Sequence, residues 1–140
     1  MNKSEIKPYE RQSNYYETDQ MGIVHHTNYF RYFEEARMDL MRQVGCSALM
    51  LENLGIIIPN VDAYAKYLRL LKFEDSFTII VKPVLFTGVR MKFEYEVVRD
   101  GEVCCTGYTT HCFVDRNMKP LILKRTHPEV YEMLAQVFAD

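Results

Sequence analysis

The spacing of apolar residues changes once along the chain, near Ile56, and this change restricts the possible folds more than any other feature. Before it, apolar side chains recur at steps of three and four residues, which predicts one amphipathic helix. The helix should begin near Asn28, with Thr27 as the alternative N-cap residue, and Gly45 fits the position just past its end. The predicted apolar stripe consists of Tyr29, Tyr32, Phe33, Ala36, Leu40 and Val44.

After Ile56 apolar and polar residues alternate, which is typical of strands with one buried face. Asp100-Gly101 is a strong signal for a two-residue hairpin, so the strands on either side of it should pair antiparallel. Pro83 lacks an amide hydrogen and should mark a bulge or an edge strand. The predicted strands span residues 61–67, 77–82, 90–97 and 102–114.

The segments before, between and after these elements are shorter. Residues 1–8 are expected to form a flexible leader, residues 9–16 a first strand, and residues 17–26 a loop in which Gly22 can adopt a backbone angle that other residues resist. A short helix capped by Ser47 and closed by Gly55 should follow the long one. Pro128 suits the first turn of a C-terminal helix. The apolar stripe of that helix would be Val130, Met133, Leu134, Val137 and Phe138.

The 140 residues suffice for one domain with a single core, and we predict that residues 1–140 form it. One long helix followed by at least four antiparallel strands predicts an α+β fold. The economical arrangement is a curved antiparallel sheet wrapped around that helix. Because one helix covers only part of such a sheet, the remaining face or edge should be buried in an oligomer.

Charge and composition exclude several classes of protein. A net charge of −2, without a basic run that carries interleaved aromatics, argues against nucleic-acid binding. No apolar run approaches the roughly 18 residues of a membrane span, and residues 1–7 lack the apolar core of a signal peptide. The four cysteines show no CxxC spacing, and the neighbours Cys104 and Cys105 are unsuited to bridging each other. We therefore expect a reduced, cytoplasmic protein.

Reactive side chains concentrate directly before the long helix. Asp19, His25 and His26 lie within a dozen residues of the predicted helix start. A carboxylate beside backbone N–H groups at a helix N-terminus suits chemistry on a carbonyl, with the acid attacking or activating water and the amides holding the oxyanion. Adjacent histidines rarely face the same way, and no Cys or carboxylate stands at ligand spacing from His111 or His127, so no metal site is expected.

The same stretch carries a family pattern. The residues read Tyr16-x-x-Asp19-x-x-Gly22-x-Val24-x-His26-x-x-Tyr29, followed by Phe33-Glu34-x-Ala36-Arg37. This pattern resembles the hotdog-fold acyl-CoA thioesterases of the 4-hydroxybenzoyl-CoA thioesterase type. The resemblance implies hydrolysis of a small- to medium-chain or aryl thioester of coenzyme A or acyl carrier protein. It also implies no cofactor, since coenzyme A belongs to the substrate, and a homodimer or homotetramer with sites between subunits.

Roles for single residues follow from the resemblance by position. Asp19 matches the catalytic aspartate, as nucleophile or as general base, and the backbone N–H of His26 would polarise the thioester carbonyl. For the His26 side chain, a role as acid or base stays open. Gly22, Val24, His25 and Tyr29 would line the substrate site. Two departures are Glu17, where many relatives carry Asp, and His25, where they often carry an aromatic residue.

Two positively charged residues further along the chain are candidates for the coenzyme A phosphates. Arg90 and Lys92 share one face of the clearest strand, although a solvated sheet face is at least as good an interpretation. His111 is expected to be a hydrogen-bonded strand residue rather than a base. Two other functions stay open: a hotdog-type dehydratase or hydratase, and a non-catalytic acyl-thioester binding protein. Release of free thiol would separate hydrolysis from both.

Overall fold

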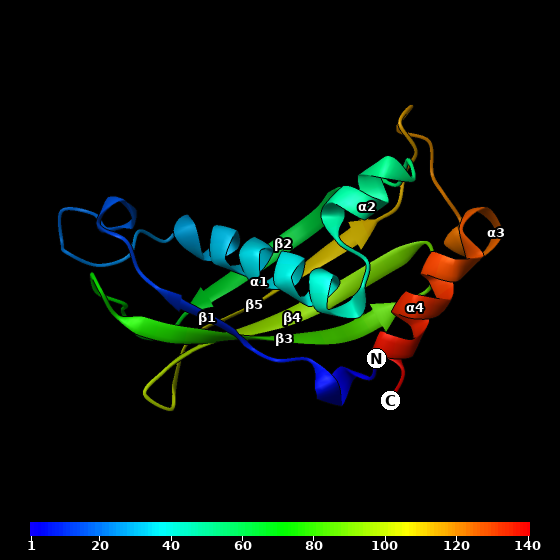
Figure 1. Cartoon of the computed structure of the whole chain (residues 1–140). Coiled ribbons are helices and arrows are strands. Elements are labelled where there is room, and N and C mark those ends of the chain that lie inside the picture. Colours follow the sequence, from blue (N-terminus) through cyan, green and yellow to red (C-terminus); the bar gives the residue numbers. More distant parts are fainter.

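The computed structural model describes residues 1–140 and contains one sheet and one long helix (Figure 1). The sheet has five antiparallel strands in the order β1-β3-β4-β5-β2. It curves around the helix α1 (Asn28–Val44), as the fold prediction required. The strands are β1 (Tyr9–Gln12), β2 (Asn60–Tyr67), β3 (Ser76–Phe86), β4 (Arg90–Arg99) and β5 (Glu102–Cys112).

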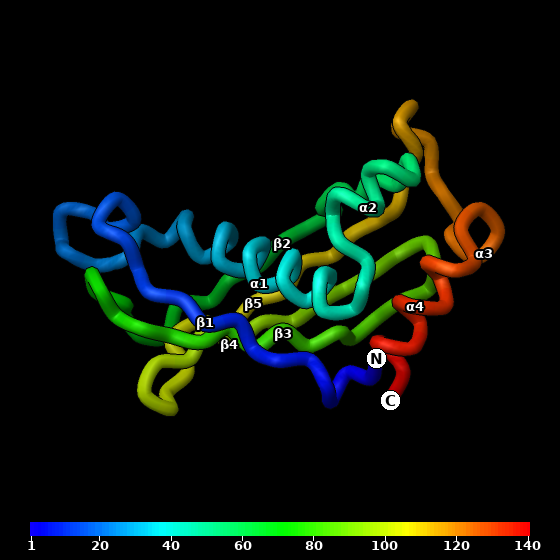
Figure 2. Tube along the Cα trace, in the orientation of Figure 1, coloured from blue at the N-terminus to red at the C-terminus, as the bar shows by residue number.

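The smaller helices lie beyond the C-terminal end of α1. They are α2 (Ala48–Asn53), α3 (Leu123–Thr126) and α4 (Pro128–Phe138), with 3-10 turns η1 (Lys3–Glu5) and η2 (Tyr15–Glu17) near the N-terminus. Both chain termini meet beside α4 (Figure 2). Ser47 caps α2 by accepting a hydrogen bond from the Met50 N–H, as predicted. No helix in the structure combines the length and the apolarity that crossing a membrane would require.

The core lies between α1 and the concave face of the sheet. All six residues of the predicted α1 stripe are buried, and so are Met91, Phe93, Tyr95 and Val97, which share one face of β4. The Phe33 ring stacks on the Tyr95 ring, with centroids 4.4 Å apart and planes 8° apart. Gly107 of β5 lies beneath this contact, and a Cβ atom there would lie 2.5 Å from Phe33 Cε2 and would also overlap the Tyr64 carbonyl oxygen. The helix therefore rests directly on the backbone of the sheet.

Two turns follow their predicted chemistry. Asp100 and Gly101 both have positive φ angles, 51° and 78°, and join β4 to β5 in a tight hairpin. The pairing of β3 with β4 shifts by one residue between Pro83 and Leu85, so Pro83 marks a bulge, and it lies in the part of β3 that β1 does not pair. The tight hairpin and the bulge thus both form at residues that interrupt a regular β-ladder.

Three predictions need correction or extension. The first strand ends at Gln12, because residues 15–17 turn into η2 instead of continuing to residue 16. Asn28 is the first residue of α1 and not its N-cap, and the cap position belongs to Thr27, whose side chain makes no capping bond. The alternating face of β2 is not buried in a single chain: only Ala65 is shielded, since α1 covers the middle of the sheet and not this edge.

Residues 1–8 contact the body of the protein. Ile6 packs against the core, and the backbone of Lys7 makes two hydrogen bonds with the Gln43 amide, at 2.8 and 3.0 Å. The mobility expected for residues 1–8 stays a prediction.

Candidate active site

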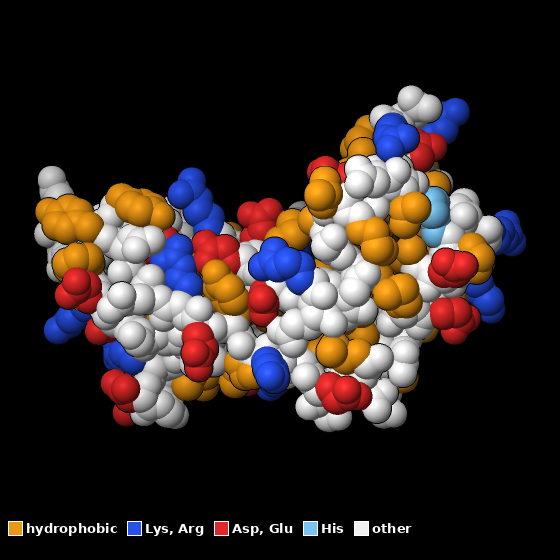
Figure 3. All heavy atoms as spheres, viewed as in Figure 1, with side chains coloured by type: hydrophobic (Ala, Val, Ile, Leu, Met, Phe, Trp, Pro, Cys, Tyr) orange, Lys and Arg blue, Asp and Glu red, His pale blue; other side chains and the backbone are white.

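The loop of residues 17–26, which we call the acidic loop, lies at the N-terminal end of α1, next to the end of β2 and the β2–β3 connection (Figures 1 and 2). Hydrogen bonds to the β2–β3 connection fix its second half: the Val24 N–H donates to the Leu71 carbonyl at 2.8 Å, and Ile23 bridges to Lys72. Exposed apolar side chains, Tyr15, Tyr16 and Met21, gather on this end of the molecule (Figure 3). The loop is therefore anchored at its base and open to solvent at its tip.

Asp19 begins a tight turn that orients its carboxylate. The Asp19 carbonyl accepts the Gly22 N–H at 3.0 Å, and Gly22 has a φ of 74°, which explains the glycine. Asp19 Oδ1 accepts the Met21 N–H at 2.8 Å, while Oδ2 makes no hydrogen bond. Asp19 lines an open hollow together with His25, Asn28 and other residues of the loop and helix start. One carboxylate oxygen is thus held and the other is available.

The two histidines lie between this hollow and β2. Their rings are tilted against each other with centroids 4.3 Å apart, and the His25 Nδ1 atom lies 2.8 Å from Thr27 Oγ1. The His26 ring contacts the edge of the Tyr67 ring, and the Tyr67 hydroxyl donates to the His26 carbonyl at 3.2 Å. The backbone N–H of His26 has no hydrogen-bond partner. His25 therefore lines the same hollow as Asp19. The backbone N–H of His26 is a hydrogen-bond donor without an acceptor.

Tyr29 lies on the buried side of the helix start rather than in the hollow. It is 3% exposed and packs edge-on against the rings of Tyr32 and Tyr67. Burial, followed by the nearby Cys105 and Cys104, raises the pKa of the Tyr29 hydroxyl above its ordinary value, so the phenol stays neutral. Val24 is buried as well. Both residues support the loop from beneath.

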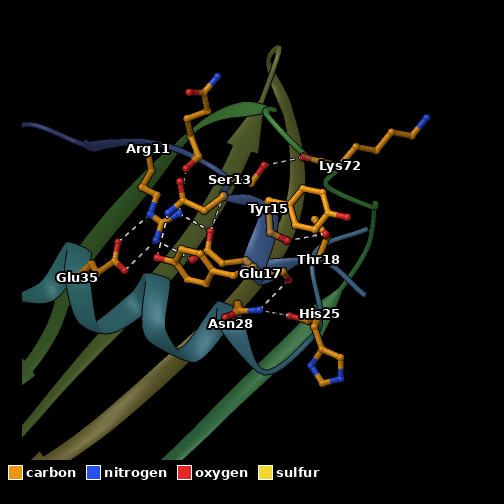
Figure 4. A network of polar contacts seen from close by, with 12 residues as sticks. Arg11, Ser13, Tyr15, Glu17, Thr18, His25, Asn28, Glu35 and Lys72 are labelled. Carbon is orange, nitrogen blue, oxygen red and sulfur yellow. Dashed lines mark hydrogen bonds and ion pairs between the residues drawn. The ribbon is translucent and has the colours of Figure 1, made fainter. Parts of the chain in front are cut away.

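A partly buried ion-pair cluster, which we call the Glu17 clasp, joins β1, the loop and α1 (Figure 4). Arg11 donates to both oxygens of Glu17, at 2.5 and 2.7 Å, and to both oxygens of Glu35, at 2.9 and 3.2 Å. Its guanidinium also lies 4.6 Å from the centre of the Tyr32 ring. Burial alone would raise the pKa of Glu17, but Arg11 and the Asn14 N–H lower it below the ordinary value. Glu17 is therefore an ionised anchor.

Sequence patterns alone do not predict this clasp. Glu17 stands out in the sequence only as a departure from the Asp of many relatives, and Arg11 lies in the predicted first strand, residues 9–16, with no expected partner. The signal lay in the types of residue: an Arg and two Glu near an aromatic ring, in a strand and a helix expected to pack together. Arg11 is 6 residues from Glu17 and 24 residues from Glu35 in the sequence, and neither separation belongs to a periodic pattern that predicts contact.

Arg90 and Lys92 lie toward the other end of the sheet. Tyr67 pairs with Cys105 beside the helix start, whereas Arg90 pairs with Cys112, seven residues further along β5. At about 3.3 Å per residue this is about 23 Å. The Lys92 ammonium lies 4.4 Å from the centre of the Tyr108 ring. The structure thus groups six of the eight predicted site residues in the loop and helix start, and it separates these two from them.

A second hollow, apolar and of about 200 Å³, lies beside the C-terminal half of α1. Its lining includes Met38, Met41, Leu51, Ile57 and Ile58, with the Arg37 side chain on its wall. Met38 is ten residues from the start of α1, which places it about 15 Å from that end of the helix. The apolar hollow and the Asp19 loop therefore lie at opposite ends of one helix.

His111 belongs to neither hollow. It is fully buried in β5, and its Nε2 atom lies 2.8 Å from Thr109 Oγ1, as predicted for a hydrogen-bonded strand residue. Burial and the nearby Arg37 guanidinium lower the pKa of His111 to about 4, so its ring is neutral at pH 7. Cys104 and Cys105 are also buried.

A five-stranded antiparallel sheet wrapped around one long helix, with an acidic loop before that helix, defines a hotdog protein. The chain belongs to the Thioesterase-like superfamily, whose family profile matches residues 14–137. The resemblance to hotdog thioesterases and the predicted fold class are therefore confirmed, and so is the predicted class of enzyme, a thioester hydrolase.

Individual relatives agree with this family. An Aquifex aeolicus protein provisionally named an esterase is 34% identical over 126 residues, which cover 90% of this chain and 95% of that protein. The structure of a DHNA-CoA thioesterase from Staphylococcus aureus superimposes with a TM-score of 0.89 at 29% identity, covering 93% of this chain and 89% of the other. A 1,4-dihydroxy-2-naphthoyl-CoA hydrolase from Thermosynechococcus vestitus is 26% identical over 102 residues, covering 72% and 70%.

Proposed function

We propose that this protein hydrolyses acyl-CoA thioesters, with Asp19 and the backbone N–H of His26 as the reacting pair. The observation that carries the proposal is their arrangement: a carboxylate with one unbonded oxygen and an amide with no partner, both at the N-terminus of α1. A thioester carbonyl needs a nucleophile or base on one side and an electrophile at its oxygen. This loop supplies both.

In the proposed reaction the free oxygen of Asp19 attacks the carbonyl carbon or takes a proton from an attacking water. The His26 N–H holds the developing oxyanion, assisted by the positive end of the helix dipole. Collapse of the tetrahedral intermediate breaks the C–S bond and releases the thiolate. Where water attacks, this step leaves the free acid; where Asp19 attacks, it leaves an acyl-Asp19 anhydride that a water molecule then hydrolyses. A thiol pKa of about 8.5 makes this a good leaving group, so we assign the contribution of His26 to its backbone amide and not to its ring.

The proposed acyl group is small to medium in length or aromatic. The aryl class receives support from the two relatives named for 1,4-dihydroxy-2-naphthoyl-CoA or DHNA-CoA, and the apolar hollow beside α1 suits either class. Coenzyme A is the proposed carrier and acyl carrier protein the alternative. Arg90 and Lys92 stay predicted contacts for the CoA phosphates. Because they lie far from the acidic loop, such contacts require an extended CoA or a site shared between subunits. The four free thiols suit the cytoplasm, where we place the protein.

The test is a screen for thiol release. Purified protein is incubated with aliphatic, branched and aryl acyl-CoAs and with a thiol reagent, and we expect turnover that depends on the acyl group. A dehydratase or hydratase would change the acyl chain without releasing thiol. A binding protein would retain acyl-CoA stoichiometrically. Absence of thiol release across the whole series would contradict the proposal.

The same proposal includes a homodimer joined along β2, or a tetramer of such dimers. β2 is an edge strand of eight residues, and its side chains Val61, Tyr64 and Tyr67 are between 44% and 49% exposed. Antiparallel pairing of two β2 strands sets the start of one beside the end of the other. Ile57 and Ile58, just before β2, would then lie near Tyr67 and His26 of a second copy. The apolar hollow of one subunit would thereby receive the acyl group bound at the partner's loop.

Mixed dimers test this sharing of sites. Asp19→Asn removes the carboxylate, and Met38→Trp fills the apolar hollow, so each variant alone should be inactive. If the site combines Asp19 of one subunit with the hollow of the other, each mixed dimer has one intact site. Random reassociation should then restore about a quarter of the wild-type activity. Activity no greater than the sum of the two separate variants would show that each site lies within one chain.

A further inference from the structure

The side chain of Asn28 connects the two ends of the acidic loop. Its Nδ2 group donates to the Glu17 carbonyl at 2.9 Å and to the His25 carbonyl at 3.3 Å (Figure 4). Asn28 is only 6% exposed, although it lies on the first turn of α1. Both acceptors are carbonyl oxygens, so the amide nitrogen, and not the amide oxygen, must face them. Position 28 therefore requires a neutral side chain with two hydrogens to donate.

The backbone of Asn28 contributes to the same arrangement. Its N–H donates to the His25 carbonyl at 3.0 Å, so this carbonyl accepts both the backbone and the side chain of Asn28. The Glu17 carbonyl likewise accepts two donors, the His25 N–H at 2.8 Å and the Asn28 amide. The peptide units on both sides of His25 are thus held from the helix and from the clasped end of the loop.

This arrangement determines the direction of the neighbouring amide. The His25 carbonyl and the His26 N–H belong to one planar, trans peptide unit, in which C=O and N–H point in opposite directions. Because two donors hold the carbonyl toward α1, the His26 N–H must point away from the helix body, and no group of the chain accepts it. An oxyanion donor is effective when its orientation is set before the reaction.

We propose that Asn28 is a positioning residue that orients the His26 N–H toward the thioester carbonyl. Its contribution rests on the proposed function, since it acts on the oxyanion donor of that reaction. Without the two amide hydrogens, the His25–His26 peptide can rotate, and the Glu17 and His25 carbonyls lose their common donor. Loss of this orientation should destabilise the transition state, in which the oxyanion forms, more than it weakens binding of the substrate.

Two variants of position 28 separate positioning from packing. Asn28→Asp has nearly the same shape but presents acceptor oxygens to two carbonyls, and Asn28→Ala removes the group. We expect each to lower kcat by about tenfold or more with KM changed by less than about threefold, in line with a partly lost oxyanion donor. Asn117→Ala is the matched control, because Asn117 is exposed and its side chain makes no hydrogen bond; it should keep wild-type kinetics.

A pair of unreactive ligands supplies a readout that a general structural defect does not imitate. One is a ketone analogue of the acyl-CoA with CH₂ in place of sulfur, which keeps the carbonyl; the other is an S-alkyl-CoA thioether, which lacks it. The Asn28 variants should weaken binding of the ketone by about tenfold relative to the thioether, because only the ketone uses the oriented N–H. Thermal melting of each variant monitors the fold.

The outcomes are distinguishable. Equal weakening of both ligands, or wild-type kcat in Asn28→Asp, would overturn the positioning role while leaving the hydrolase assignment intact. If the wild-type protein released no thiol from any acyl-CoA, the proposed function itself would fail. If the alanine variant does not fold, the isosteric aspartate variant and the ketone-to-thioether ratio still decide the matter.

Discussion

Asp19→Asn should lower acyl-CoA hydrolysis by at least about 100-fold and leave the fold intact. The amide oxygen of Asn can still accept the Met21 N–H, so the turn that begins at Asp19 is preserved. The lost property is the negative charge on the free oxygen, which the amide nitrogen cannot replace as a nucleophile or base. Thiol release under saturating substrate measures the effect, and thermal melting checks the fold.

The matched control is Asp100→Asn. Asp100 lies in the β4–β5 turn with a positive φ of 51°, a conformation that Asn tolerates, and it is far from the loop in the sequence. This variant should keep wild-type turnover. Turnover of Asp19→Asn within a few-fold of the wild type would remove Asp19 from the mechanism. Single turnover in H₂¹⁸O tests the nucleophilic role: water that attacks the Asp19 carbonyl of an acyl-enzyme anhydride leaves the label in Asp19, whereas a general base acquires none.

Gly107→Ala should destabilise the protein by about 3 kcal/mol, because overpacking of a close-packed interior costs about 1 to 3 kcal/mol and here one obstacle is backbone. The added methyl group would meet the Phe33 ring and the Tyr64 carbonyl oxygen at once. Relief requires α1 to lift from the sheet or β2 to separate from β5. For a domain of this size we expect Tm to fall by about 10 °C, measured by thermal melting, together with a lower denaturant midpoint.

Gly101→Ala provides the comparison for Gly107→Ala. Gly101 has a φ of 78°, but no atom lies within 4 Å of the position that a Cβ would take, so only backbone strain opposes the substitution. Its cost should be about 1 kcal/mol. If Gly107→Ala melted at or above the temperature of Gly101→Ala, the direct contact between helix and sheet would be refuted.

The main elements of the fold were predictable because each has a strong local signal. The period of α1, the alternation in β4 and the Asp100-Gly101 hairpin are properties of neighbouring residues, and the structure confirms each of them. The edges of the sheet were not predictable in this way. β1 has only four residues, and the exposed face of β2 has the same alternation as a buried strand.

For the candidate site, the sequence predicted which residues stand together but not how they are held. Asp19 and the two histidines are close in sequence, and the family pattern marked them. The contacts of Asn28 depend on where a side chain points at a helix start, and its type alone favoured a capping role. The free N–H of His26 follows from a peptide orientation that side-chain types do not encode. Sequence patterns identify which chemical groups belong to the site, whereas the directions in which these groups point follow only from the three-dimensional structure.

The Glu17 clasp constrains how related sequences can diverge. Arg11 balances two carboxylates from separate elements, and Glu17 reaches it from a buried position. Shortening Glu17 to Asp withdraws the carboxylate by one methylene, about 1.5 Å, and leaves a buried charge without its partner, a change that costs several kcal/mol. We therefore expect positions 11, 17 and 35 to vary together among related sequences. A homologue with Asp at position 17 should also carry a different arrangement at the other two.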